Sequence, residues 1–235
     1  CETYGGSTIA AVFIEPIAGS TGTIVPPVGY LERVREICDE HEILLVFDEV
    51  ITGFGRTGKA FASQTYGVTP DIITMAKALT NGAIPMGAVA VRDEIYETVT
   101  NAAPENAIEF FHGYTYSAHP AACAAGIATQ KIFENEGLFQ RASDMSGYFL
   151  DAVWSLRDHP LVADLRGFGM MAGIEIKHDG VGGRRGTQLQ KDMFWNGLHV
   201  KFTGDNAILA PAFVAEKPQI DEIVEKFRKT LDQHI

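Results

Sequence analysis

Apolar positions in the first half of the chain form short continuous runs separated by a stretch with helical spacing. Residues 8–15 and 43–47 are nearly continuous apolar runs, which are typical of strands buried on both faces. Between them, residues 29–41 place Leu31, Val34, Ile37 and Cys38 on one helical face. This strand–helix–strand order predicts a right-handed crossover and a parallel sheet with both faces covered. Two further short strands are predicted at residues 71–75 and 86–91.

From residue 117 onward, strands and helices no longer alternate regularly. The pattern predicts helices over residues 117–137, 138–157, 187–196 and 218–233, and strands at 162–166, 171–176, 200–202 and 207–209. The expected fold class is therefore α/β: a mostly parallel sheet flanked by helices, followed by a smaller α+β part.

Composition narrows the function classes. The 235 residues carry a formal net charge of −11, and the longest basic run is Arg184–Arg185, so neither a nucleic-acid partner nor a membrane partner is expected. The three cysteines are odd in number and show no CxxC spacing, so neither a disulfide framework nor a metal site is expected. Cysteines without disulfides fit a reducing compartment, which favours the cytoplasm. No apolar stretch reaches the length of a membrane span.

Two charged residues follow apolar runs. Asp48 comes directly after the run 43–47, and Lys77 follows the run 71–75. Because ligands of parallel α/β sheets bind at the carboxyl ends of strands, we expect both residues to reach one edge of the sheet. A desolvated lysine is a nucleophilic amine, and a carboxylate can keep a heterocyclic nitrogen protonated. Taken alone, a turn-capping aspartate and a solvated lysine are the commoner interpretation. Together, the two groups suit pyridoxal phosphate.

The surrounding sequence makes the assignment specific. The stretches 44–58, "LLVFDEVITGFGRTG", and 71–82, "DIITMAKALTNG", resemble the class III aminotransferase signature of the fold type I pyridoxal-phosphate enzymes. Residues 15–50 and 110–126 are similar, more narrowly, to the β-alanine–pyruvate (ω-amino acid–pyruvate) aminotransferases. This resemblance implies that pyridoxal 5'-phosphate is the cofactor.

The resemblance also assigns roles to the cofactor-site residues. It implies that Asp48 pairs with the pyridine nitrogen, that Val50 packs under the ring, and that Lys77 is the Schiff-base residue and proton shuttle. Thr115 is expected to contact the cofactor phosphate, usually from the neighbouring subunit, although a local backbone hydrogen bond is the alternative. Tyr114 either lines the pocket or packs at a subunit interface.

Candidate substrate contacts lie elsewhere in the chain. Glu15 is similar to a family glutamate near the floor of the active site, with a structural salt bridge as the alternative. Arg56 is interpreted as structural, in a pair with Glu49. Lys201 stands where relatives often carry an arginine, so it would neutralise a substrate carboxylate without two-point binding; an exposed strand lysine is the alternative. Some relatives gate this arginine with a glutamate, but the corresponding residue here is Ser20.

The expected activity is transamination from an ω-amino acid or primary amine, such as β-alanine, to a keto acid such as pyruvate. An aminomutase reaction and a non-catalytic fragment or assembly partner stay open as alternatives. The resemblance implies that residues 1–130 are the C-terminal portion of the cofactor-binding large domain and that residues 131–235 are the small domain. The chain begins without methionine and close to a strand, so we expect it to be the C-terminal part of a longer chain that forms a homodimer.

Overall fold

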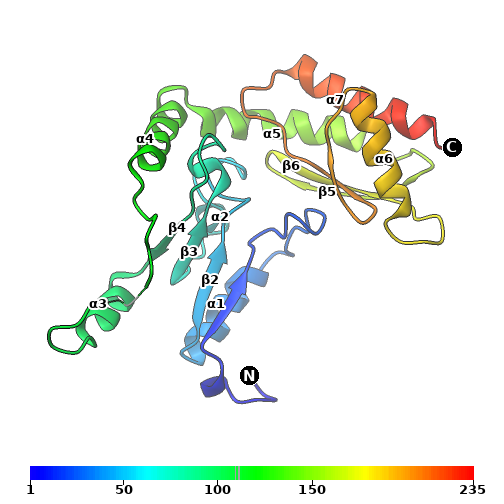
Figure 1. The fold of residues 1–235 in the computed structure, drawn as a ribbon. Coiled ribbons are helices and arrows are strands. Elements are labelled where there is room, and N and C mark those ends of the chain that lie inside the picture. Colours follow the sequence, from blue (N-terminus) through cyan, green and yellow to red (C-terminus); the bar gives the residue numbers. More distant parts are fainter. Residues whose placement is uncertain (109, 111) are drawn as a thin grey trace.

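Two four-stranded sheets organise the chain, as seen in the computed structural model, which describes residues 1–108, 110 and 112–235 (Figure 1). The first sheet has the order β1-β2-β3-β4, with strands Ala11–Ile14, Leu44–Asp48, Ile72–Met75 and Ala88–Val91. The second has the order β5-β6-β8-β7, with β5 Val162–Phe168, β6 Met171–Ile176, β7 Lys201–Thr203 and β8 Asn206–Leu209.

Helices and short 3-10 turns connect these strands. The helices are α1 Tyr30–Glu40, α2 Ala62–Tyr66, α3 Asp93–Asn101, α4 Pro120–Asn135, α5 Leu138–Trp154, α6 Arg184–Trp195 and α7 Lys217–Asp232. The 3-10 turns are η1 Gly6–Thr8 and η2 Lys77–Leu79. The α/β class expected from the sequence is confirmed. Helices α2 and α3 were not predicted.

The first sheet contains the expected crossover. Strands β1, β2 and β3 are parallel, and α1 connects β1 to β2. Strand β4 is antiparallel to β3, because the connection 76–87 contains only η2 and lacks the crossover helix that a parallel return requires. One face buries Leu31 and Cys38 of α1 against Phe47.

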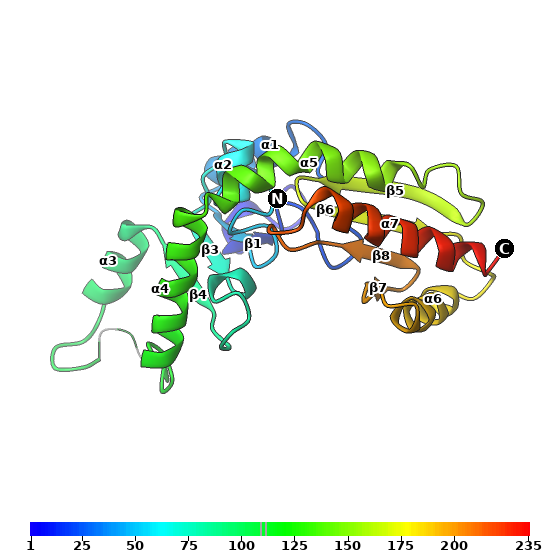
Figure 2. The same cartoon turned by 90° about the horizontal axis from the view of Figure 1, so that it is seen from above.

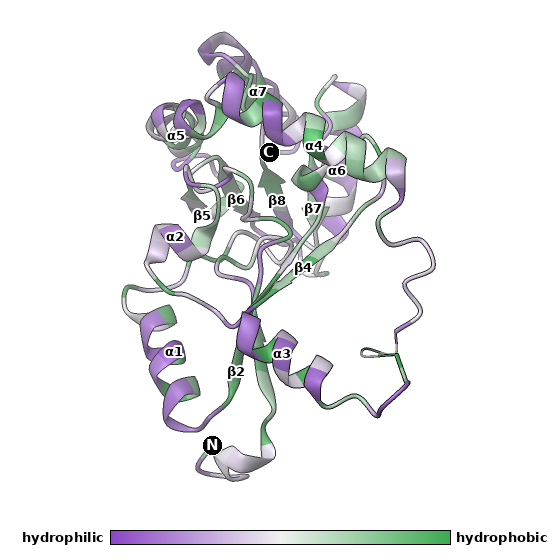
Figure 3. Cartoon of the chain, turned by 90° about the vertical axis from the view of Figure 1, so that its left-hand side faces the viewer, coloured by the Kyte–Doolittle hydropathy of each residue, from purple (hydrophilic) through white to green (hydrophobic). Residues whose placement is uncertain are grey.

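The opposite face of the first sheet is partly open in the described part of the chain, although Val46 on that face is buried. Phe13 is 73% exposed and Val89 is 63% exposed. The expectation that both faces are covered is therefore wrong for these residues, because α1 and α2 supply their apolar side chains to one face. Figure 3 shows the same contrast between the largely apolar strands and the polar outer side of α1.

The second sheet is antiparallel throughout and carries the larger core. Helices α5 and α7 run side by side along it (Figure 2). Phe149 of α5, Phe227 of α7 and Ile174 of β6 are all essentially inaccessible to solvent. This core supports the strand pair β7–β8, which lies beside the loops that follow β1 and β2.

Candidate active site

Asp48 and Lys77 lie at the same edge of the first sheet. Asp48 is the last residue of β2 and is paired with Thr74 of β3. Lys77 follows three residues after Thr74, at the start of η2. The prediction that both residues reach the same sheet edge is therefore confirmed. The Asp48 carboxylate acts electrostatically on the Lys77 amine, although the two residues are 29 positions apart in the sequence.

The backbone of Lys77 has an unusual conformation. Its φ is 45°, in the left-handed region that non-glycine residues rarely adopt. The chain following it stabilises this conformation: Gly82 N donates to Lys77 O at 3.2 Å, and Thr80 Oγ1 donates to Ile84 O at 2.7 Å. From α4, Gln130 Nε2 donates to Leu79 O at 3.3 Å. Such strain persists only where the surroundings fix it, and it is concentrated at functional sites.

The environment of Lys77 favours its neutral amine form. Desolvation, followed by the positive charge of Lys201, lowers the pKa of Lys77 below its ordinary value. Asp48 and Glu15 act in the opposite direction and do not outweigh them. At a given pH, more of this amine is therefore available as a base or nucleophile than for an isolated lysine.

The loop after β2 is fixed by Glu49, a residue whose role the sequence reasoning missed. Asp48 Oδ1 accepts a hydrogen bond from Val50 N at 3.0 Å. Glu49 is only 1% exposed and points the opposite way, with its carboxylate accepting from Thr52 Oγ1, Ala62 N and Ser63 N at 2.7–2.8 Å. The sequence signal for a buried carboxylate was an acidic residue next to an apolar run. It could not identify the hydrogen-bond donors, because these lie up to 14 residues away.

A cavity of about 700 Å³ opens beside Lys77. Val50 and Lys77 from the first sheet line it together with Ser20 from the loop after β1 and Lys201 from β7. Lys201 Nζ donates to Ser20 Oγ at 3.1 Å, so the strand lysine is held at the cavity by a neutral hydroxyl. The structure thus brings together three of the predicted site residues, Val50, Lys77 and Lys201, and adds Ser20.

Four predicted residues are not among those that line the cavity. One of them is Asp48, which lies at the adjoining strand end and accepts a hydrogen bond from the cavity residue Val50. Thr115 is exposed, and its hydroxyl donates to Gly113 O at 3.4 Å, which is the local alternative. Tyr114 is also exposed, and its ring lies against that of His112 in a tilted arrangement with the centroids 3.9 Å apart. Glu15 Oε2 accepts from Gly19 N at 3.0 Å and shapes the turn that carries Ser20.

The predicted pair of Arg56 with Glu49 is wrong. Arg56 Nη1 donates to Met170 O at 2.9 Å and to Pro211 O at 2.8 Å, and both acceptors belong to loops of the second sheet. Glu49 is satisfied by hydroxyl and amide donors from its own loop and α2, so it needs no guanidinium. Burial lowers the pKa of Arg56 to about 10.

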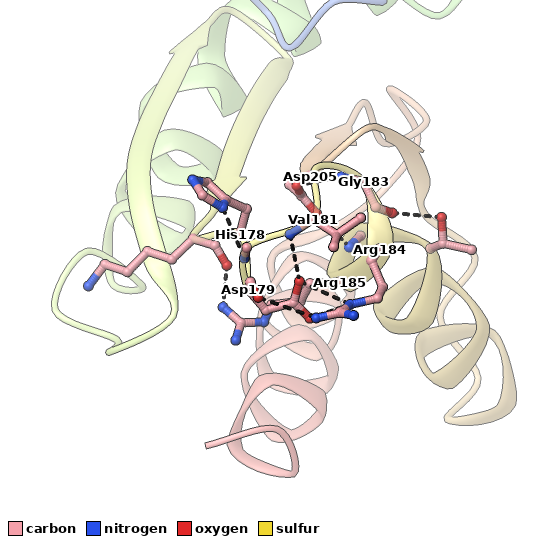
Figure 4. A network of polar contacts seen from close by, with 11 residues as sticks. His178, Asp179, Val181, Gly183, Arg184, Arg185 and Asp205 are labelled. Carbon is pink, nitrogen blue, oxygen red and sulfur yellow. Dashed lines mark hydrogen bonds and ion pairs between the residues drawn. The ribbon is translucent and has the colours of Figure 1, made fainter.

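The basic pair Arg184–Arg185 is not free for phosphate (Figure 4). Arg184 Nε pairs with the carboxylate of Asp179 at 3.0 Å, and Arg185 donates to the Lys177 carbonyl. Asp205 accepts from Gly183 N at 2.7 Å and from Gly186 N at 2.8 Å, so a carboxylate already caps helix α6. This cap also explains why α6 begins at Arg184, three residues earlier than predicted.

No group of three or more His, Cys, Asp or Glu side chains among the described residues is placed to hold a metal ion. No helix in the same part of the chain is both long and apolar enough to cross a membrane.

A lysine of lowered pKa that lines a cavity, with a carboxylate at the adjoining strand end, suits a carbonyl-bearing heterocyclic cofactor. The family model "Aminotransferase class-III" matches residues 2–231, and the chain belongs to this family.

Curated relatives agree with this family. Over 98% of its own length, the chain is 51% identical to the omega-aminotransferase of Caulobacter vibrioides. Over 99% of its own length, it is 46% identical to the omega-amino acid–pyruvate aminotransferase of Pseudomonas putida. The chain spans about half of each relative, 52% in both cases.

Solved structures agree with the fold. An (S)-enantioselective omega-transaminase from Thermomicrobium roseum superposes with a TM-score of 0.92 at 37% identity, over 99% of this chain and 53% of that one. The omega transaminase of Pseudomonas jessenii in complex with PMP gives a TM-score of 0.93 at 33% identity, over 97% of this chain and 52% of that one. These are fold type I transaminases, as the sequence resemblance implied.

Proposed function

We propose that this chain contributes the lysine and carboxylate of an aminotransferase that uses pyridoxal 5'-phosphate. The amino donor is an ω-amino acid or a primary amine, such as β-alanine, and the acceptor is a keto acid such as pyruvate. The observation that carries the proposal is the placement of Asp48 and Lys77 at adjoining strand ends, with Lys77 on a cavity that also receives Lys201. The relatives named for ω-amino acids and pyruvate support the substrate classes.

The donor set suits the cofactor. Lys77 would hold its aldehyde carbon through Nζ, Asp48 would hold its ring nitrogen, and Val50 would lie against the ring. The bound cofactor supplies an electron-withdrawing ring that stabilises negative charge on the substrate carbon. Asp48 would keep the ring nitrogen protonated. Its carboxylate is oriented by the Val50 amide, which donates to Oδ1 at 3.0 Å.

Lys77 is the proton carrier in the proposed reaction. With the cofactor bound, Nζ of Lys77 would take a proton from the donor carbon that bears nitrogen and would deliver it to the cofactor side. The lowered pKa helps because the neutral amine is the form that accepts a proton. With the keto acid, the same amine moves the proton in the opposite direction.

Lys201 is the proposed contact for a substrate carboxylate. Its ammonium lines the cavity and is bonded to the Ser20 hydroxyl, and no carboxylate in the described residues lies within ion-pair distance of it. An ammonium binds a carboxylate as a point charge, so amines without a carboxylate are tolerated better than an arginine would allow. Glu15 and Tyr114 are proposed as more distant contributors to the same site.

The proposed assembly is a cytoplasmic homodimer with its sites at the interface. Thr115 is exposed, so its proposed phosphate contact is to the cofactor of the second subunit. Residues 1–130 form the proposed C-terminal portion of the large domain, and residues 131–235 form the small domain. The two four-stranded sheets fall on either side of this boundary.

Borohydride reduction of the full-length gene product tests the cofactor and the lysine together. We expect a visible absorbance that reduction abolishes and a cofactor label that maps to Lys77 by mass spectrometry. A label on another lysine, or no bound cofactor, would contradict the proposal. An acceptor screen with pyruvate and 2-oxoglutarate then separates a transaminase from an aminomutase, which needs no keto acid.

A further inference from the structure

Arg56 makes an unusual set of contacts for a buried cation. Nη1 donates to two main-chain carbonyls, those of Met170 and Pro211, and the guanidinium carbon lies 4.5 Å above the ring centre of Phe213. In the described part of the chain, no carboxylate lies within ion-pair distance of it. A buried charge without an ionic partner is costly, so its retention requires a role that neutral side chains would not perform.

Both acceptors lie at one end of the second sheet. Met170 directly precedes β6, and Pro211 comes two residues after the end of β8. Strands β6 and β8 are paired there, with Ala172 opposite Leu209. One guanidinium therefore connects the loop that follows β2 to two adjacent strands of the other sheet.

The connection is reinforced by the main chain. Met170 N donates back to Arg56 O at 2.9 Å. At Gly169, an added Cβ would lie only 2.9 Å from Thr57 Cα, so the two backbones are in direct contact with no room for a side chain. The loop after β2 and the turn between β5 and β6 thus form one rigid unit.

Strand β8 transmits this restraint to Lys201. Lys201 is paired with Ile208, the residue before the last in β8, and Pro211 follows three residues after Ile208. We propose that Arg56 is a positioning residue for Lys201: by fixing the end of β8 against the loop that carries Asp48 and Val50, it holds the ammonium of Lys201 on the cavity it shares with Lys77. This inference rests on the proposed function, because it assumes that Lys201 receives a carboxylate.

Propionate binding tests the inference without requiring catalysis. Propionate carries the carboxylate of β-alanine but lacks the amine, so its affinity for the full-length holoenzyme, measured by calorimetry, reports carboxylate recognition alone. Arg56→Lys keeps the charge but cannot bridge two carbonyls with a planar fork. We expect it to weaken propionate binding roughly tenfold, as the loss of one charge-assisted hydrogen bond would. Lys201→Met should weaken binding at least as much.

A double-mutant cycle separates positioning from direct contact. If Arg56 acts through Lys201, then Arg56→Lys in the Lys201→Met background has no further effect beyond about twofold. A tenfold additional loss in that background means that Arg56 binds the carboxylate itself and overturns the inference. No propionate binding by the wild-type holoenzyme would overturn it as well.

Arg141→Lys is the matched control for a purely structural effect. Arg141 of α5 donates to the carbonyls of Phe213, Val214 and Ala215 in the same connection, but beyond the end of β8. We expect it to lower the melting temperature comparably while propionate affinity stays within about twofold of wild type. Equal weakening of propionate binding by both variants would show a general loss of structure and overturn the inference.

Steady-state kinetics keep this result distinct from the proposed function. At saturating pyruvate, Arg56→Lys should raise the KM for β-alanine, whereas the KM for propylamine, which has no carboxylate, should stay near wild type. A wild-type holoenzyme that binds propionate but transaminates no donor would refute the proposed function and leave the positioning of Lys201 testable by calorimetry.

Discussion

Replacing Glu49 with alanine should destabilise the protein more than almost any other single carboxylate change. The carboxylate accepts from Thr52 Oγ1 at 2.8 Å, from Ala62 N at 2.7 Å and from Ser63 N at 2.8 Å. Glu49, Thr52 and Ala62 are buried, so water cannot replace these bonds without opening the loop. Each unsatisfied buried donor costs about 1–3 kcal/mol, and we expect a total loss of about 3–5 kcal/mol in the free energy of unfolding.

Glu49→Gln should lower the free energy of unfolding by a smaller amount than Glu49→Ala. Thr52 and Ala62 donate to one carboxylate oxygen, and Ser63 donates to the other. A glutamine can keep its carbonyl oxygen toward the first two donors, but its amide then meets the Ser63 N–H, another donor. One lost bond predicts a cost of about 1–3 kcal/mol.

Glu36→Ala is the control for this series. Glu36 pairs with Arg33 at 2.9 Å on the surface of α1, and both side chains are more than half exposed. Such a pair contributes less than about 1 kcal/mol. Urea unfolding followed by circular dichroism measures all three variants. If Glu49→Ala costs no more than Glu36→Ala, the three hydrogen bonds do not stabilise the loop and the reasoning fails.

Three further predictions concern charged residues, namely Lys77, Lys201 and Asp71. Lys77→Ala should abolish transamination while leaving the circular dichroism spectrum unchanged, and steady-state turnover by that variant would contradict the assignment. Lys201→Met should raise the pKa of Lys77 by removing a like charge, so the rate at which apoprotein combines with pyridoxal phosphate should reach its midpoint at higher pH; an unchanged midpoint would contradict this. Burial alone would raise the pKa of Asp71, but the Leu45 N–H and two guanidinium partners hold it below its ordinary value. Stability contributed by a carboxyl of lowered pKa is present above about pH 4 and is lost as the pH falls through the folded pKa, so Asp71→Asn should flatten the acid limb of the stability profile.

Local pattern was enough to place the reactive pair. Asp48 and Lys77 each follow a short apolar run, and parallel pairing of the runs brings their ends together whatever happens elsewhere in the chain. The same local logic located most helices, because their apolar spacing is set within a few turns. The α6 boundary was wrong because the cap comes from Asp205, 19 residues from Gly186.

Long-range partners could not be predicted from the sequence. Arg56 and Glu49 are seven residues apart and opposite in charge, which suggested an ion pair, yet the acceptors of Arg56 lie 114 and 155 residues further along the chain. Every residue has a main-chain carbonyl, so the pattern of side chains could not predict which carbonyls accept from Arg56. The strand at β4 was predicted, but its antiparallel direction was not, because the direction of a strand depends on the path of the preceding loop and not on the composition of the strand.

Arg56 and Lys201 both line the cavity, and the acceptors that hold these two cations share a property with consequences for the site. Arg56 donates to main-chain carbonyls and Lys201 donates to the Ser20 hydroxyl, so each cation is oriented by neutral groups. A carboxylate partner would have oriented them equally well, but it would also have cancelled their charge. Neutral acceptors leave these charges uncancelled. The charge of Lys201 adds to desolvation in lowering the pKa of Lys77, and it remains available to a substrate carboxylate. The same arrangement therefore serves both the reactivity of the amine and the recognition of the acid.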